Sequence, residues 1–161
     1  MSEVIRVGMA DYKLCSSPDQ ITTLGLGSCL GVVICDPTMR LCGMAHVMLP
    51  DSKKISKNGE RMKFADTCLA DMFEELLQKG ANRTRLYAKI AGGAKMFSFD
   101  SDNEMLNIGI QNTNAVRKFL QEHRIPIKAE HVGENFGRTI VFNPEDGALH
   151  ITAIGKGKYI I

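Results

Sequence analysis

The sequence has no tryptophan, and aromatic residues make up only 6% of its 161 residues. Neither sign of charge predominates, because the formal net charge is only +2. This near balance gives no argument for binding to nucleic acid or to an anionic membrane. No apolar run approaches the roughly 20 residues that a membrane-spanning helix needs. We therefore expect neither a nucleic-acid partner nor direct membrane insertion.

The sequence also lacks the marks of a secreted protein. Its start, MSEVIRVGMADYKL, has no basic region followed by an apolar stretch, so no signal peptide is expected. An odd number of cysteines does not suggest a disulfide framework. The five are Cys15, Cys29, Cys35, Cys42 and Cys68. We expect a cytoplasmic protein.

What is present suits one globular domain over residues 1–161, with 44% hydrophobic and 24% charged residues. Apolar spacing of three and four predicts a helix from Ala65 to Leu77, ended by Gly80, and a second from Thr113 to His123. Short apolar runs, which are too short for a helix, predict strands. They cover 4–9, 20–24, 29–35, 41–49, 86–90, 127–132, 138–142 and 149–154, with Asp146-Gly147 turning the last pair. These elements predict an α/β domain of the α+β type. In this single-domain sandwich, two main helices pack on a mixed, mainly antiparallel sheet.

One segment, TTLGLGSCLGVVICDPTMRLCGMAHVMLP, covers residues 22–50 and combines a cysteine, a histidine and a glycine-rich bend. Both of its strands are apolar on two faces, which is typical of strands covered on both sides. If residues 36–39 form the hairpin loop, Cys35 lies opposite Arg40 and Cys29 lies opposite His46. Directly opposed side chains share a face, with Cβ atoms roughly 4.5–5.5 Å apart. This register predicts that the thiol and the imidazole meet.

A cysteine beside a histidine suits nucleophilic catalysis. A free thiol has a pKa near ~8.5, and an adjacent imidazole can take its proton. The bend before Cys29 would let the backbone N–H groups around Gly27 and Ser28 face a developing oxyanion. A hydroxyl from Thr22 or Thr23 could orient the imidazole. The other interpretation, that cysteine and histidine are both buried core residues, stays open on these residues alone.

Other site types fit the sequence less well. Cys35, Cys42 and His46 have a spacing that matches no usual zinc pattern, so no metal is expected. The glycines of Gly25–Ser28 and Ala91–Ala94 match neither common phosphate-binding motif, and close backbone packing explains them better. The lysine-rich residues 50–61 are interpreted as an exposed loop.

Several motifs follow one another along the chain: TTLGLGSC, the Asp-Pro turn and GMAHVMLP, then KIAGGAKMF at 89–97, NIG at 107–109 with Asn112, and the glycine-arginine pair 137–138. In this order they closely resemble the CheD family of chemoreceptor glutamine deamidases. The resemblance spans roughly residues 5–150. One departure is Ile110-Gln111, where the family often has Glu-Arg, and this puts in doubt any partner contact assigned there.

The resemblance implies a CheD-like deamidase domain that needs no cofactor. Such proteins convert particular receptor glutamines to glutamate through a cysteine thioester, and some also act on glutamate methyl esters. The family's nucleophile falls on Cys29, its histidine on His46 and its polar third residue on Thr23. The implied partners are the cytoplasmic domains of methyl-accepting chemotaxis receptors and a CheC-type phosphatase. The alternative function is a binding module that regulates both partners.

Overall fold

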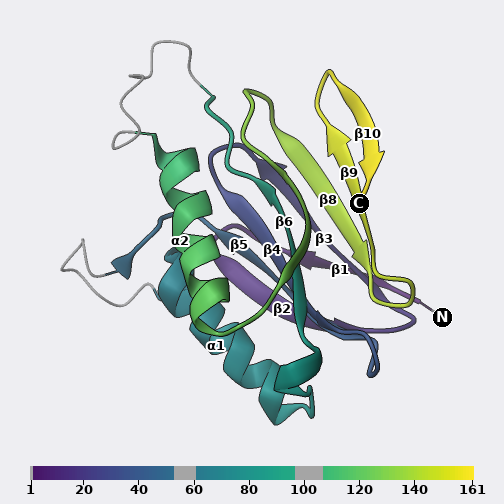
Figure 1. The fold of residues 1–161 in the computed structure, drawn as a ribbon. Coiled ribbons are helices and arrows are strands. Elements are labelled where there is room, and N and C mark those ends of the chain that lie inside the picture. Colours follow the sequence, from purple (N-terminus) through teal and green to yellow (C-terminus); the bar gives the residue numbers. More distant parts are fainter. Residues whose placement is uncertain (1, 53–60, 97–106) are drawn as a thin grey trace.

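The computed structural model describes residues 2–52, 61–96 and 107–161, and its elements form three layers (Figure 1). Most of the predicted loop 50–61, and Phe97 of the glycine-rich motif, lie outside these residues. The helices are α1 (Ala65–Gln78) and α2 (Ile108–Glu122), with short 3-10 turns at Arg61–Lys63 and Arg83–Arg85. The strands are β1 (Val4–Val7), β2 (Asp11–Ser16), β3 (Gln20–Leu26), β4 (Leu30–Asp36), β5 (Leu41–Val47), β6 (Tyr87–Gly92), β7 (Ile127–Val132), β8 (Arg138–Asn143), β9 (Ala148–Ala153) and β10 (Gly157–Ile160).

The middle layer is a sheet of order β2-β5-β4-β6-β7, and both of its faces are covered. Helices α1 and α2 lie on one face, and the second sheet, of order β1-β3-β8-β9-β10, lies on the other (Figure 1). Two apolar clusters fill the gaps between the layers: one joins the helices to the middle sheet, and the other joins the two sheets. Every residue of β4 and β5 is buried, which confirms the prediction that these strands are covered on both sides.

The α+β class with two main helices is confirmed, but the strands divide between two sheets. Two strands were not predicted. Strand β2 lies at the edge of the middle sheet, and β10 is exposed along its whole length and pairs only with β9. Within the described residues, β1–β3 and β6–β7 pair in parallel and the remaining pairs are antiparallel. Edge strands bury little apolar surface, so their sequences carry a weak hydrophobic signal.

Helix α2 begins five residues before the predicted start at Thr113. Asn107 is the reason, because its side chain accepts a hydrogen bond from the Ile110 N–H at 3.2 Å and caps the first turn. This earlier start adds a turn in which Gly109 packs against the backbone that follows β6. An added Cβ at Gly109 would lie 2.5 Å from the Gly93 carbonyl oxygen. The helix can therefore approach the middle sheet closely.

The predicted register of the β4–β5 hairpin is wrong by two residues. Cys35 pairs with Cys42 rather than Arg40, and Gly31 rather than Cys29 pairs with His46. The turn comprises residues 37–40, because Asp36 stays in the strand and pairs with Leu41. Side chains alternate between faces along a strand, so a shift of two residues leaves each side chain on its predicted face.

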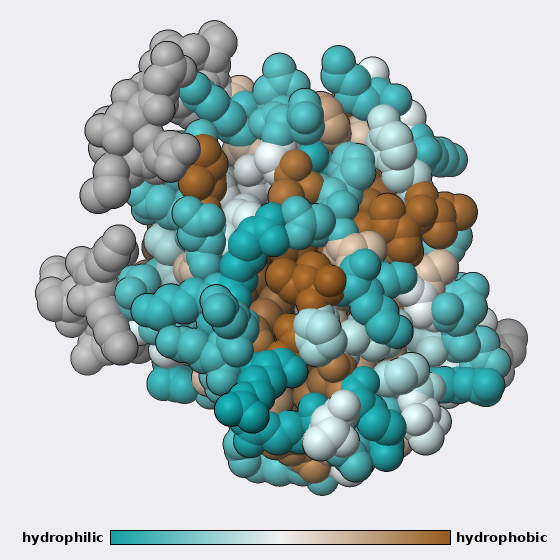
Figure 2. Space-filling view, in the orientation of Figure 1, coloured by the Kyte–Doolittle hydropathy of each residue, from teal (hydrophilic) through white to brown (hydrophobic). Residues whose placement is uncertain are grey.

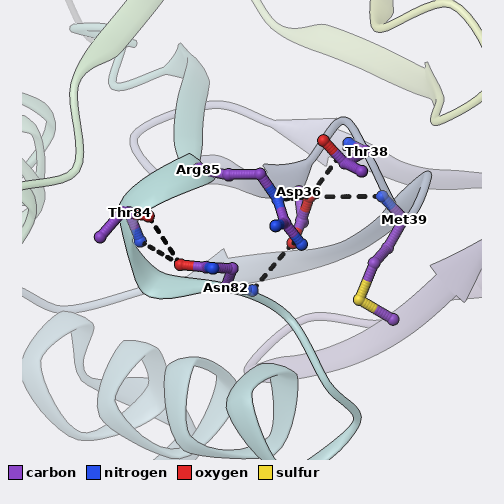
Figure 3. Close-up of polar contacts among 6 residues, drawn as sticks. All are labelled: Asp36, Thr38, Met39, Asn82, Thr84 and Arg85. Atoms are coloured by element: carbon purple, nitrogen blue, oxygen red, sulfur yellow. Dashed lines mark hydrogen bonds and ion pairs between the residues drawn. The ribbon is translucent and has the colours of Figure 1, made fainter.

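Asp36 fixes this register through its buried carboxylate (Figure 3). The carboxylate accepts hydrogen bonds from the N–H groups of Thr38 and Met39 inside the turn and of Asn82 outside it. The guanidinium of Arg85 adds a two-pronged ion pair at 2.9 and 3.1 Å. Burial by itself would raise the pKa of Asp36, but the hydrogen bonds from Arg85 and from the N–H groups of Asn82 and Met39 outweigh it and lower the pKa to about 2.

No helix in the described ranges is long and apolar enough to cross a membrane. In the view of Figure 2, apolar side chains reach the surface in several separate patches surrounded by hydrophilic residues. Large apolar side chains that are exposed include Val4, Met9, Leu24, Met96, Ile154 and Ile160.

Candidate active site

His46 lies on β5 and contacts the second sheet through Thr23 on β3. The Thr23 Oγ1 is 2.7 Å from the His46 Nδ1, and both side chains are buried. Gly31, the β4 partner of His46, permits this close approach of the sheets. An added Cβ there would lie 2.7 Å from the Cδ1 of Ile140 on β8. Thr22 points elsewhere and donates to the Ile140 carbonyl. The structure thus places Thr23, rather than Thr22, against the imidazole.

The Thr23 hydroxyl also determines which ring nitrogen of His46 carries the proton. Its one hydrogen is donated to the Val7 carbonyl oxygen at 2.8 Å, and that oxygen can only accept. The Thr23 oxygen must then accept a hydrogen from Nδ1 of His46. The neutral ring therefore has its lone pair on Nε2. This atom is buried, and no group in the described part of the chain hydrogen-bonds to it.

Cys29 lies in the bend between β3 and β4, one residue before β4 begins. Its side chain is half-buried and packs against the apolar cluster between the two sheets, which is the side that His46 faces. The prediction that the two side chains share a face is therefore confirmed, although they are not directly opposed. Because Nε2 of His46 has no hydrogen-bond partner among the described residues, the thiol and the imidazole do not hydrogen-bond to each other.

Both groups are held in their neutral forms. Burial raises the pKa of the Cys29 thiol, although its own backbone N–H partly offsets the shift. Burial also lowers the pKa of the His46 imidazole. The resting pair is thus a thiol and a neutral imidazole, which differs from the ionised sulfur that the sequence alone suggested. Proton transfer would have to accompany attack on a substrate.

The bend that carries Cys29 is held in place by hydrogen bonds to the backbone carbonyl groups of its three residues. The Gly27 carbonyl accepts from the Ala94 N–H at 2.8 Å, and the Cys29 carbonyl accepts from the Gly93 N–H at 2.9 Å. The Ser28 carbonyl accepts from the Asn112 side chain on α2 at 2.9 Å. No other residue among those described accepts a hydrogen bond from the N–H groups of Gly27, Ser28 or Cys29, and the Cys29 N–H interacts with its own thiol. These donors are available to a bound oxyanion.

The two glycines at the end of β6, Gly92 and Gly93, are explained by close packing around this bend. Gly92 has a φ of 113° and Gly93 a φ of 67°, values that favour glycine. An added Cβ at Gly92 would lie 2.4 Å from the Cys29 carbonyl oxygen, and one at Gly93 would lie 2.4 Å from the Thr113 Oγ1. The backbone can approach the candidate nucleophile this closely only with glycine, which confirms the packing interpretation of Ala91–Ala94.

Asn112 is the residue of this site that sequence reasoning missed. It formed part of the NIG motif, but it lay just before the predicted helix, and nothing in the local pattern indicated contact with two distant backbone segments. Cys35 and Cys42 are buried in the core between the sheets. Across the ranges that the structure covers, no group of three or more histidine, cysteine, aspartate or glutamate side chains is arranged to hold a metal ion.

Comparison with known proteins shows the family of the chain. A family model described as CheD chemotactic sensory transduction matches residues 48–153. A protein of Lachnoclostridium phytofermentans is 54% identical over 97% of both chains. The chain belongs to the CheD family.

The CheD relatives match along nearly their full length. The one from L. phytofermentans, and one from Caldanaerobacter subterraneus that is 50% identical over 99% of both chains, are each named "Probable chemoreceptor glutamine deamidase CheD". A relative from Halalkalibacterium halodurans, 50% identical over 98% of both chains, is named "Chemoreceptor glutamine deamidase CheD".

A solved structure, that of the hypothetical protein YfiH of Bacillus licheniformis, is similar at a TM-score of 0.48 and 15% identity. It covers 75% of this CheD chain, which spans about half (49%) of that chain. The two are too dissimilar for the likeness to bear on function.

Proposed function

We infer that this CheD protein is a chemoreceptor glutamine deamidase, an enzyme that hydrolyses the side-chain amide of particular glutamines on methyl-accepting chemotaxis receptors. The observation that carries this conclusion is the match to three relatives of that name, at 50–54% identity over at least 97% of each chain. The product is a glutamate side chain, and ammonia is released. Each turnover therefore changes a neutral receptor side chain into a negative one.

We propose that Cys29 is the nucleophile and that His46 is its base. The support is the position of the thiol on the face that the imidazole occupies, together with the free lone pair on Nε2. As the Cys29 sulfur bonds to the glutamine Cδ, its proton passes to Nε2. Catalytic hydrogen bonds are often long or poorly aligned before substrate binds, so a resting site without a bond between Cys29 and His46 is compatible with this role.

The attack moves a pair of electrons onto the amide oxygen. In this proposal the N–H groups of Ser28 and Cys29, which follow Gly27 in the bend, donate to that oxyanion. The support is that the Gly27 and Ser28 carbonyls, which share peptide units with these two N–H groups, are held by Ala94 and Asn112. The protonated His46 then gives its proton to the departing nitrogen, the C–N bond breaks, and a thioester with Cys29 remains.

In the second half of the cycle, the thioester is hydrolysed and His46 again accepts and then donates a proton. A water molecule in the place left by ammonia loses a proton to His46 as its oxygen bonds to the thioester carbon, and the sulfur leaves with that proton. Thr23 keeps the proton on Nδ1 and the lone pair on Nε2 in both steps, which is the role of the third group in such sites. Nothing in this cycle calls for a metal or an organic cofactor.

The cellular compartment and the second protein partner are proposed on separate grounds. All five cysteines are free, which suits a reducing compartment, so we propose that the protein acts in the cytoplasm on the cytoplasmic domains of receptors. The family resemblance supports a CheC-type phosphatase as a second partner. Titration of the protein with the phosphatase from the same organism would test that pairing, and no detectable complex would remove it.

The deciding experiment is incubation with purified receptor fragments from the same organism, with the products mapped by mass spectrometry. The unaltered protein should add about 1 Da at specific glutamines, and Cys29→Ala should add none. Cys68→Ala is a matched control, since Cys68 is a buried cysteine on α1 and outside the site. Continued conversion by Cys29→Ala would exclude the cysteine mechanism. Restored signalling in cells by the same variant would instead favour a binding role.

A further inference from the structure

Asn112 links the two backbone segments that carry the proposed nucleophile and base. It lies on α2 and is completely buried. One hydrogen of its Nδ2 goes to the Ser28 carbonyl at 2.9 Å, and the other goes to the Met48 carbonyl at 3.0 Å. Ser28 immediately precedes Cys29, and Met48 follows His46 by two residues. One side chain thus uses its full donor capacity on these two segments.

The bond to Ser28 has a consequence for the neighbouring N–H. A peptide unit is planar and trans, so the C=O of Ser28 and the N–H of Cys29 point in opposite directions. Because Asn112 holds this C=O toward the helix layer, the Cys29 N–H is turned away from the helix. The same reasoning applies to the preceding unit, where Ala94 holds the Gly27 carbonyl. The Gly27–Ser28 peptide unit, however, is held by a backbone N–H, whereas the Ser28–Cys29 unit is held by the side chain of Asn112.

We propose that Asn112 is a positioning residue for deamidation: it aims the Cys29 N–H at the substrate oxyanion and ties this donor to the strand of His46. The proposal rests on the proposed function, because an oxyanion forms only if Cys29 attacks an amide. Asn112 itself touches no reacting atom. It acts through the Ser28–Cys29 peptide unit, and its bond to Met48 keeps that unit at a set distance from the end of β5.

The unpaired oxygen of Asn112 supports a role beyond stability. Its Oδ1 is buried, and no partner for it exists within the described residues. An unpaired buried acceptor destabilises the fold, and an amide flip would be worse, because Oδ1 would then face two carbonyl oxygens. The neighbouring Thr113 relieves none of this cost, since its hydroxyl donates to the Gly109 carbonyl within α2. Asparagine at this position is better explained by its two donors than by a contribution to folding.

The test compares Asn112→Leu, which has a similar shape and no polar atom, with Asn112→Asp, which has the same shape and loses the amide donors. Thr113→Val is the matched control, because it removes a buried polar group from the same turn and leaves both carbonyls satisfied. For each protein, kcat and KM are measured on a receptor fragment. In parallel, the rate of Cys29 alkylation by iodoacetamide is followed by peptide mapping.

Loss of one oxyanion donor lowers kcat by about 10²–10³-fold in other enzymes. We expect both Asn112 variants to lose about 10²-fold in kcat with KM changed less than about threefold, and Thr113→Val to stay near the unaltered value. Alkylation forms no oxyanion, so its rate should change less than about threefold. This split between the two reactions is a result that a merely structural role would not produce.

Two results would overturn the proposal. One is a kcat within about threefold of the unaltered protein in an Asn112 variant. The other is an equal fall in turnover and alkylation, which would mean that the variant disturbs the whole bend. If Asn112→Leu does not fold, Asn112→Asp is judged by the same two rates. An active Cys29→Ala protein would instead refute the cysteine mechanism, so failure of the two proposals can be told apart.

Discussion

The two ends of the β4–β5 hairpin treat buried polar groups in opposite ways. At the turn, the Asp36 carboxylate is buried and has partners on both oxygens, from three backbone N–H groups and from Arg85 (Figure 3). At the other end, His46 Nε2 and Asn112 Oδ1 are buried with no partner among the described residues. Unpaired buried polar atoms are rare because each costs about 1–3 kcal/mol. The polar contacts at the turn stabilise the fold, whereas at the other end the Nε2 of His46 stays unpaired and can accept a proton.

The largest effect is expected when the unpaired Nε2 of His46 is removed. His46→Gln should lower kcat on a receptor fragment by about 10³-fold, because general acid–base catalysis contributes about 10²–10⁴-fold. The melting temperature should also fall somewhat, since the variant loses the buried hydrogen bond between Nδ1 and the Thr23 hydroxyl, so kcat is compared at a temperature where both proteins are folded. A kcat within tenfold of the unaltered protein would show that Nε2 is not the base.

A smaller effect is expected when the hydroxyl that orients the ring is removed. Thr23→Val leaves the Val7 carbonyl and the His46 Nδ1 without their shared partner. The ring is then free to place its proton on Nε2, and we expect kcat to fall by about 10–10²-fold. Thr23→Ser, which keeps the hydroxyl, is the control and should remain within a few fold. Nitrogen chemical shifts of His46 should show mixed tautomers in the valine variant alone; an unchanged Nδ1–H form would contradict the assignment.

At the turn end, the expected effect is on stability and not on turnover. Asp36→Asn should lower the free energy of unfolding at pH 7 by about 2 kcal/mol, since each unit of pKa shift corresponds to about 1.4 kcal/mol. The folded pKa of Asp36 lies below its unfolded value, so its contribution is complete above about pH 4 and is lost as pH falls toward about 2. Denaturant unfolding across this range should show the two proteins converging. An equal gap at pH 2 and pH 7 would exclude the ionised carboxylate as its cause.

The smallest effect concerns the ionisation of the candidate pair. Burial raises the thiol pKa of Cys29 and lowers the imidazole pKa of His46, so the neutral pair should persist through neutral pH. The rate of Cys29 alkylation should therefore keep rising with pH into the alkaline range. A plateau that begins in the acidic range would instead reveal a thiolate–imidazolium pair at rest. Site-specific alkylation rates measured from pH 5 to pH 10 would decide between the two.

The sequence predicted much of this arrangement because local patterns carry it. The two fully apolar strands, the helix α1 and the Asp146-Gly147 turn were all predicted from spacing and turn residues. The register was missed because turn length depends on Asp36, whose carboxylate is bound by Asn82 and Arg85 some 50 residues away. Strand β10 was missed because it is exposed throughout and has little apolar signal.

By itself, the sequence determined which residues are available and on which face of a strand each one lies, because side chains alternate regardless of register. Cys29 and His46 share a face for this reason, even though the predicted pairing was wrong by two residues. Only the tertiary structure decided which atoms meet. Thr23 reaches His46 from the other sheet, and Asn112 reaches the Cys29 bend from a helix, because the packing of separate layers brings distant segments together and no local pattern encodes such contacts.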